Sequence, residues 1–154
     1  MSDDGRFSFL TPGRLHDGEL DLVLARCTPG DQGRGQVPAY GFEMRVGTTP
    51  VGSVNLRIGW THDLEHYFGH LGYDVIPSFR GHHYAERACR LLLPLARAHG
   101  LTAVWITCNP DNVASRRTCE RLGATLVEIV ALPPSSEMYQ RGEREKCRYR
   151  LALD

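Results

Sequence analysis

Hydrophobic and polar residues alternate along two stretches in the first half of the chain, residues 40–46 and 54–58. A period of two is typical of a strand that buries one face, and the Gly-Thr-Thr-Pro segment at 47–50 is suited to a turn. The pattern therefore predicts a hairpin. An apolar, β-branched run at 20–27 predicts an earlier strand.

The next apolar run, residues 67–76, predicts another strand. Its two glycines, Gly69 and Gly72, indicate a bulge or a close approach of two backbones. The polar residues 61–66 that precede it are expected to form a loop.

The second half of the chain changes to helical spacing. Apolar residues at positions 84, 88, 91, 92 and 95 predict a helix over 84–98, which Pro94 kinks and Gly100 ends. The apolar run at 103–108 predicts a buried strand. Residues 113–122 predict a second helix, because cap-forming side chains precede it and a glycine follows it.

Two last strands are predicted at 124–132 and 146–153, with a loop at 133–145 between them. The order is a run of strands, followed by strand, helix, strand, helix, strand and strand. It predicts an α/β fold, with a central mixed sheet, flanking helices and a right-handed crossover. At 154 residues, the whole chain (1–154) is expected to be a single domain.

Composition narrows the classes of partner. Lys and Arg together number 18, as do Asp and Glu, so we expect no nucleic-acid partner. No stretch approaches 18 apolar residues and the first ten residues do not form a signal peptide, so we expect no membrane partner. The five cysteines include no CxxC pair, which favours reduced thiols in a cytoplasmic protein.

The segment before the first helix has the layout of an anion site. Arg80-Gly81-His82-His83 leads directly into the helix start, where free N–H groups and the helix dipole attract anions. Histidine keeps its backbone N–H and tolerates left-handed conformations better than most residues. Arg80 adds positive charge, and an ordinary turn is the alternative.

The chain resembles the GNAT superfamily of acyl-CoA-dependent N-acyltransferases over residues 70–131. The family's pyrophosphate signature, Gln or Arg, two residues, Gly, one residue, then Gly or Ala, is similar to Arg80 through Ala85, with His83 in place of the first Gly. Asn112 and Gly123 match the start and end of the helix that follows in the family. The resemblance implies a mostly antiparallel sheet and acetyl-CoA as co-substrate.

The same resemblance implies which residues contact the coenzyme. The strand backbone should meet the pantetheine and thioester, the loop should hold the pyrophosphate, and the second helix should complete the site. The implied residues are Tyr73, Asp74, Val75, Arg80, Gly81, His82, His83, Tyr84, Ala85, Asn112 and Ser115. Arg116, Arg117 and Arg121 are expected on the solvated face of the second helix, with contact to a coenzyme phosphate as the alternative.

One departure from the family concerns the acceptor side. GNAT proteins usually carry two helices between their first two strands, whereas residues 27–39 are too short and too rich in Gly and Pro to supply both. We therefore expect this helix pair to be reduced or absent. The acceptor pocket is then more open, or built from another loop such as 133–145.

For the general base, His70 is the first candidate, because it lies on the strand near the expected thioester and titrates near neutrality. A sheet histidine satisfied by hydrogen bonds is the alternative role. Glu65, His66, Asp74 and a bound water are the other candidates for the base.

For the general acid, Cys119 stands where the family often has Tyr, seven residues after Asn112. A thiol can protonate a thiolate of similar basicity. The alternatives are that Cys119 is a small buried hydrophobe, that Tyr139 serves, or that no acid is needed. A metal site is not expected: His62, His66 and His70 recur every fourth residue, but the predicted strand does not bring such spacing together.

These features predict an N-acetyltransferase that transfers the acetyl group of acetyl-CoA to a primary amine, with a small molecule as the preferred acceptor. A protein N-acetyltransferase and a non-catalytic acyl-CoA sensor on the same fold are the alternatives. Exposed strand edges near the C-terminus are compatible with a homodimer.

Overall fold

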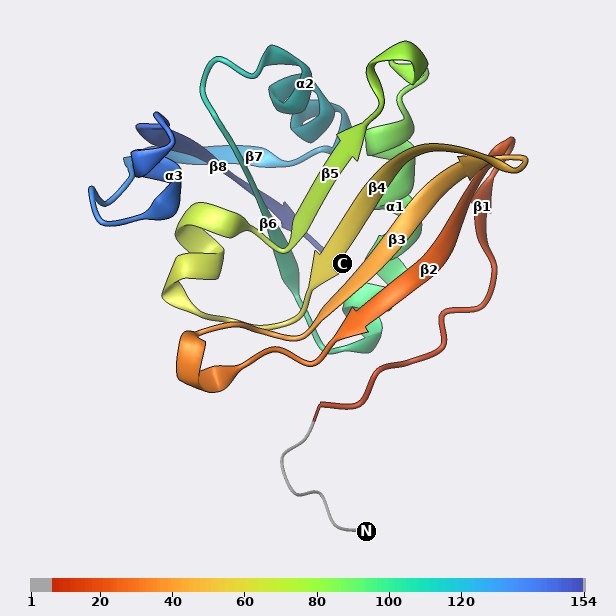
Figure 1. The fold of residues 1–154 in the computed structure, drawn as a ribbon, viewed down its shortest axis with the longest axis horizontal. Coiled ribbons are helices and arrows are strands. Elements are labelled where there is room, and N and C mark those ends of the chain that lie inside the picture. The colour runs from red at the N-terminus through yellow and green to blue at the C-terminus, as the bar shows by residue number, and fades with distance from the viewer. Residues whose placement is uncertain (1–6, 154) are drawn as a thin grey trace, which may run out of the picture.

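The computed structural model describes residues 7–153, whose first half consists mainly of strands and whose second half alternates helices and strands (Figure 1). The strands are β1 (Leu15–Asp17), β2 (Leu20–Thr28), β3 (Ala39–Val46), β4 (Thr49–Arg57), β5 (Leu71–Val75), β6 (Ala103–Cys108), β7 (Thr125–Ala131) and β8 (Glu145–Ala152). The helices are α1 (Tyr84–Ala98), α2 (Val113–Leu122) and α3 (Glu137–Gln140), and the short helical turns are η1 (Gln32–Arg34), η2 (Leu64–Phe68) and η3 (Pro77–Phe79).

The strands form two antiparallel sheets. The first has the order β1-β2-β3-β4-β5 and the second the order β6-β8-β7. β5 and β6 meet at one end, where the His70 N–H donates to the Trp105 carbonyl at 2.7 Å, and then separate toward α2 and the turn before α1 (Figure 1). The opening between these two strands is the feature that positions the site.

One hydrophobic cluster joins both sheets to the two long helices. Leu92 of α1 is fully buried in the same cluster as Met44 and Val54 of the first sheet and Tyr149 of the second. The apolar side of α1 therefore fixes the start of this helix against the end of β5. None of the helices in residues 7–153 is long and apolar enough to cross a membrane.

The α/β fold class, the antiparallel pairing and the main elements were predicted correctly, although the described strands form two antiparallel sheets in place of one central mixed sheet. The helices at 84–98 and 113–122 and the strand at 103–108 occupy the predicted residues, and β3 and β4 form the predicted hairpin. The short strand β1 and the helix α3 were not predicted, because three or four residues carry no periodic signal.

The segment before β5 corrects the prediction. Residues 64–68 form a helical turn, so the polar stretch is not a loop throughout, and the strand begins only at Leu71. The Thr61 hydroxyl accepts from the Leu64 N–H at 3.1 Å and starts the turn, and Gly69, at φ 73°, ends it. The cap from Thr61 and the glycine at 69 thus favour a helical turn over the strand that the apolar pattern predicted for residues 67–70.

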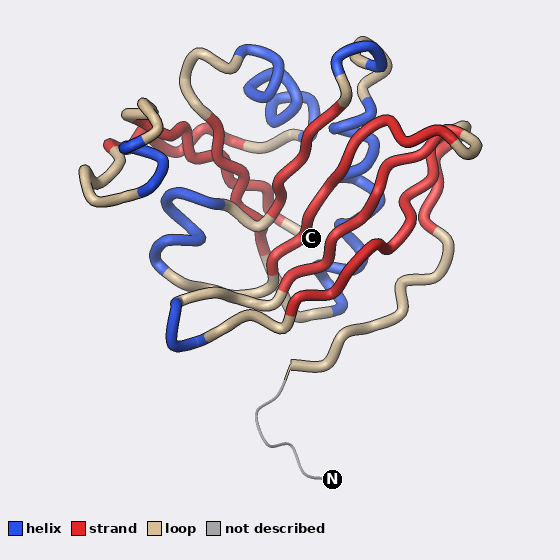
Figure 2. The backbone as a smooth tube through the Cα atoms, viewed as in Figure 1, coloured by secondary structure: helices blue, strands red, loops and turns tan. Residues whose placement is uncertain are grey.

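The connection from β2 to β3 holds one short helical turn, η1, in place of the helix pair that is usual in the family that the sequence resembles (Figure 2). Asp31 caps this turn by accepting from the Gly33 N–H, and Gly35 ends it with φ 68°. The Gly and Pro content of the segment therefore predicted the missing helices correctly. The acceptor side is bounded by other elements.

Candidate functional site

The turn before α1 presents its backbone N–H groups outward. No described residue accepts a hydrogen bond from the N–H groups of residues 81–86. Gly81 has φ 99° and His83, at the N-cap of the helix, has φ 60° and ψ 31°. His83 thus adopts the left-handed conformation that a glycine would usually supply there. The free N–H groups and the dipole of a 15-residue helix give this turn the groups that attract an anion.

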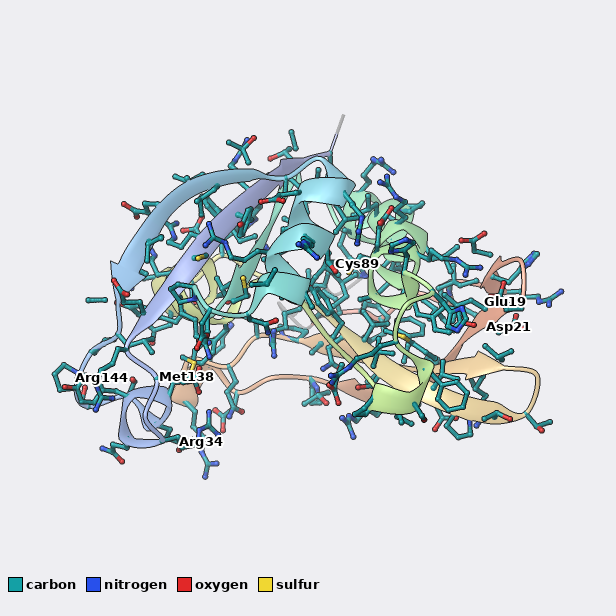
Figure 3. All side chains as sticks on the ribbon, turned by 90° about the horizontal axis from the view of Figure 1, so that it is seen from above. Glu19, Asp21, Arg34, Cys89, Met138 and Arg144 are labelled. Carbon is teal, nitrogen blue, oxygen red and sulfur yellow. The ribbon has the colours of Figure 1, made fainter. Side chains whose placement is uncertain are left out.

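Ion pairs tie this turn to the β1–β2 hairpin. The Arg87 guanidinium lies 2.8 Å from Asp17 and 2.9 Å from Glu19, and the Tyr84 hydroxyl donates to Glu19 at 3.0 Å. The Arg87 hydrogen bonds are the largest of the contacts that lower the pKa of Glu19 from 4.5 to about 2. In Figure 3, Glu19 lies at one end of the molecule and Met138 and Arg144 lie at the opposite end.

A cavity of about 500 Å³ opens between the end of β5, the turn and α2. Its wall contains ten of the eleven residues expected to contact a coenzyme: Tyr73, Asp74, Val75, Arg80, Gly81, His83, Tyr84, Ala85, Asn112 and Ser115. The eleventh, His82, is not part of the wall, and its ring stacks on Tyr84. We refer to this space as the loop cavity.

Arginines add positive charge to the loop cavity. Arg80 donates to the Val75 carbonyl at 3.2 Å, which holds its side chain beside the turn. Arg117 and Arg121 are exposed, as expected of a solvated face, and they also line this wall. Arg116 is not part of this wall; it donates to the Tyr149 hydroxyl at 3.0 Å. Three arginines and a set of free N–H groups therefore face one cavity.

A second cavity of about 230 Å³ lies where β5 and β6 separate. It shares three residues with the loop cavity, Tyr73, Asn112 and Ser115, so the two spaces meet at these side chains. Its remaining wall consists of Arg57, Phe68, Leu71, Gly72, Thr107, Cys108, Asn109 and Lys146. We refer to it as the strand cavity.

The Tyr73 hydroxyl lies at the junction of the two cavities. It is 2.7 Å from the Ser115 hydroxyl and 3.8 Å from the Cys119 sulfur. Burial is the main reason that the pKa of Tyr73 is raised, so the phenol is protonated at neutral pH. The sequence implied a role only for the backbone of Tyr73, because nothing in it shows where the Tyr73 side chain points.

Two cysteines complete this network. Cys119 is fully buried and lines neither cavity. Its hydrogen bond with Cys108 and its burial raise the pKa of its thiol. Cys108 lines the strand cavity, and its pKa is lowered, first by the Cys119 hydrogen bond, then by Ser115 and by the charges of Arg116 and Lys146. Cys119 therefore has the structural role that the sequence left open, and we do not assign it as the acid.

His70 corrects the first candidate for the base. Its side chain is fully buried, Nδ1 accepts from the Trp105 N–H at 2.9 Å, and Nε2 contacts the Gly59 carbonyl at 2.8 Å. Burial lowers its pKa. Both ring nitrogens are occupied, so His70 ties β5 to β6 at the point where they separate and has no nitrogen left for an amine.

The other sequence candidates lie away from the strand cavity. Glu65 and His66 line neither cavity, and Asp74 lines the loop cavity. Tyr139 lies on α3 against Arg144, and the 133–145 loop does not line either cavity. Within residues 7–153 no group of three or more His, Cys, Asp or Glu side chains is placed to hold a metal ion.

The turn before α1, the loop cavity and the strand cavity are continuous at Tyr73, Asn112 and Ser115, so together they have room for a long ligand with an anionic end. The family model described as "Acetyltransferase (GNAT) domain" matches residues 2–125. Because the match covers most of the chain, the protein belongs to the GNAT acetyltransferase family. No curated protein matches the sequence.

Solved structures share the fold at low sequence identity. RimL, a ribosomal L7/L12 alpha-N-protein acetyltransferase in complex with coenzyme A, is 15% identical with a TM-score of 0.69, over 92% of this chain and 98% of RimL. MccE, the microcin C7 self-immunity acetyltransferase in complex with acetyl-CoA and AMP, is 20% identical with a TM-score of 0.59 over 75% of this chain. The match spans 61% of MccE.

The ribosomal-protein-S5-alanine acetyltransferase from Vibrio fischeri is 18% identical, with a TM-score of 0.61 over 75% of this chain and 62% of that protein. At these identities the similarity establishes the fold. The names of RimL and of the Vibrio fischeri protein state ribosomal proteins as acceptors, whereas that of MccE states microcin C7 self-immunity, so they do not identify the acceptor of this chain.

Proposed function

We propose that this protein is an N-acetyltransferase that transfers the acetyl group of acetyl-CoA to a primary amine. The observation that carries the proposal is the meeting of the two cavities at Tyr73, between strands that separate. Free N–H groups and three arginines line one cavity, and the other opens between the strands. We further propose that residues 1–154 form one acetyltransferase domain in the cytoplasm, where the five free cysteines stay reduced.

The residues of the loop cavity fit the phosphates of the coenzyme. The N–H groups of the turn, together with Arg80, would hold the pyrophosphate, as the resemblance implies. Arg117 and Arg121 are placed for a further phosphate. Acetyl-CoA supplies an activated acetyl thioester, and the separation of β5 from β6 leaves backbone groups of β5 free to orient it.

For proton transfer, we propose two residues that line the strand cavity. Cys108, with its lowered pKa, accepts the proton that the amine loses as the N–C bond forms. Tyr73 gives its proton to the sulfur as the C–S bond breaks. The Ser115 hydroxyl lies 2.7 Å from that of Tyr73 and helps to lower the pKa of Cys108, so it would return the proton from Cys108 to Tyr73 and balance the cycle.

A small-molecule acceptor is favoured over a protein. The strand cavity has a volume of about 230 Å³, below the roughly 300–1,000 Å³ of sites for drug-sized ligands. A protein N-terminus, the kind of acceptor that the name of RimL states, remains the alternative because only its terminal residue would need to enter.

The test is release of coenzyme A thiol from acetyl-CoA, measured with a panel of primary amines and with N-terminal peptides. We expect thiol release that depends on both the amine and the protein. Micromolar binding of acetyl-CoA without thiol release for any acceptor would instead identify an acyl-CoA sensor. Absence of acetyl-CoA binding by the folded protein would refute the proposal.

A further inference from the structure

The charges in the wall of the strand cavity are unbalanced. Arg57 and Lys146 line it, and no Asp or Glu does. Lys146 has partners: its ammonium donates to Glu143 and to Asn109, each at 2.7 Å. Arg57 is the other cation in this wall, and the acceptors that it meets are uncharged.

Arg57 has no carboxylate partner within residues 7–153. Its Nη1 donates to the carbonyls of Phe68 and Gly69 at 3.3 and 3.2 Å, and no described acceptor meets its Nε or Nη2. Both acceptors are uncharged, so they orient the guanidinium without neutralising it. The side chain is half-buried, and this burial lowers the pKa of Arg57.

Arg57 lies against β5 at the strand cavity. Arg57 is the last residue of β4, beside β5, and a Cβ on Gly72 would lie 3.5 Å from its Nη1. Gly72 and the guanidinium are therefore neighbours in the cavity wall. A partly buried charge without a carboxylate partner favours an anion, and guanidinium binds carboxylate or phosphate through two parallel hydrogen bonds.

Resting on the proposed function, we propose that the strand cavity binds amines that also carry an anionic group, a carboxylate or a phosphate, and that Arg57 holds this group. The anion would use the Nε and Nη2 donors that the protein leaves free. The amine would then point toward Cys108 and Tyr73, which share the same wall. Arg57 is a specificity-determining residue in this account.

The test uses acetylated product analogues, so that it does not depend on turnover. Calorimetry on the protein saturated with coenzyme A compares N-acetylalanine with N-acetylalaninamide, and N-acetyl-O-phosphoethanolamine with N-acetylethanolamine. We expect the wild type to bind at least one anionic member roughly 10-fold or more tightly than its neutral partner. The two pairs distinguish carboxylate from phosphate.

Substitutions assign the preference to its residue. Arg57→Gln is expected to abolish it, Arg57→Lys to retain part of it, and Arg26→Gln, an exposed change on β2 of the same sheet, to leave it unchanged. Acetyl-CoA affinity and the thermal unfolding midpoint report whether Arg57→Gln has disturbed the fold.

Equal binding of the anionic and neutral analogues by the wild type, or a preference that survives in Arg57→Gln, would overturn the proposal. Loss of acetyl-CoA affinity in Arg57→Gln with an unchanged preference would overturn it as well. If the wild type does not bind acetyl-CoA at all, the proposed function fails first, which this experiment reports separately.

Discussion

His83 allows the phosphate site to be tested with a matched pair of variants. Its side chain is exposed, its backbone is left-handed at φ 60°, and it lines the loop cavity beside the free N–H groups. Asn and Asp both tolerate this conformation and have nearly the same shape. His83→Asn and His83→Asp therefore differ in one negative charge at the point where we place the pyrophosphate.

The magnitude follows from Coulomb's law. An anion held by the N–H groups of the turn would lie roughly 6 Å from a carboxylate at position 83. At an effective dielectric constant of about 60 each pair of unit charges costs about 0.9 kcal/mol, so two phosphate charges cost about 2 kcal/mol, a roughly 25-fold rise in Kd. The same charge near the N-terminus of α1 should stabilise the fold by about 0.3–1 kcal/mol.

The assay combines calorimetric titration with acetyl-CoA and denaturant unfolding of both variants. We expect His83→Asp to bind acetyl-CoA much more weakly than His83→Asn while unfolding at an equal or higher denaturant concentration. These opposite signs separate a local repulsion from a damaged fold. Equal Kd values for the two variants would refute the placement of the pyrophosphate at this turn.

Three further changes probe the network and the fold. Tyr73→Phe should lower kcat by roughly 10²-fold or more with little change in acetyl-CoA affinity, and an unchanged kcat would exclude the phenol as the acid. In steady-state kinetics, kcat/KM of the wild type should rise with pH below the ordinary thiol pKa of about 8.5. Cys108→Ser should remove this rise, and a rise that is retained would assign it to another group. Glu19 has a lowered pKa of about 2 in the folded state, so its contribution to stability is present above pH 4.5 and is lost as the pH falls toward 2. Wild type should therefore unfold at higher temperature than Glu19→Gln at pH 7, with a difference that shrinks below pH 4.5, and a difference that does not depend on pH would contradict the ion pair with Arg87.

The sequence predicted the elements that carry a strong periodic or capping signal. The helix at 84–98 has apolar residues at helical spacing that bury one side, and the helix at 113–122 lies between Asn112, whose side chain accepts from the Ser115 N–H, and Gly123 at φ 87°. Such signals are local, so they can be read without knowledge of the fold.

The directions of the side chains at the site could not be predicted from local sequence signals. His70 and Tyr73 lie three residues apart on either side of the start of β5, yet one is enclosed by backbone groups of β4, β6 and the segment after β4, and the other points to the junction of the two cavities. Cys108 acquires its lowered pKa from Cys119 and from charges that are distant in the sequence. Contacts between remote segments decide these properties.

The most direct measurement is a crystal structure of the protein with coenzyme A. We predict that the pyrophosphate lies within hydrogen-bonding distance of the N–H groups of residues 81–85 and that the sulfur lies beside the Tyr73 hydroxyl, between β5 and β6. Phosphates bound away from this turn, or a sulfur remote from Tyr73, would contradict the account.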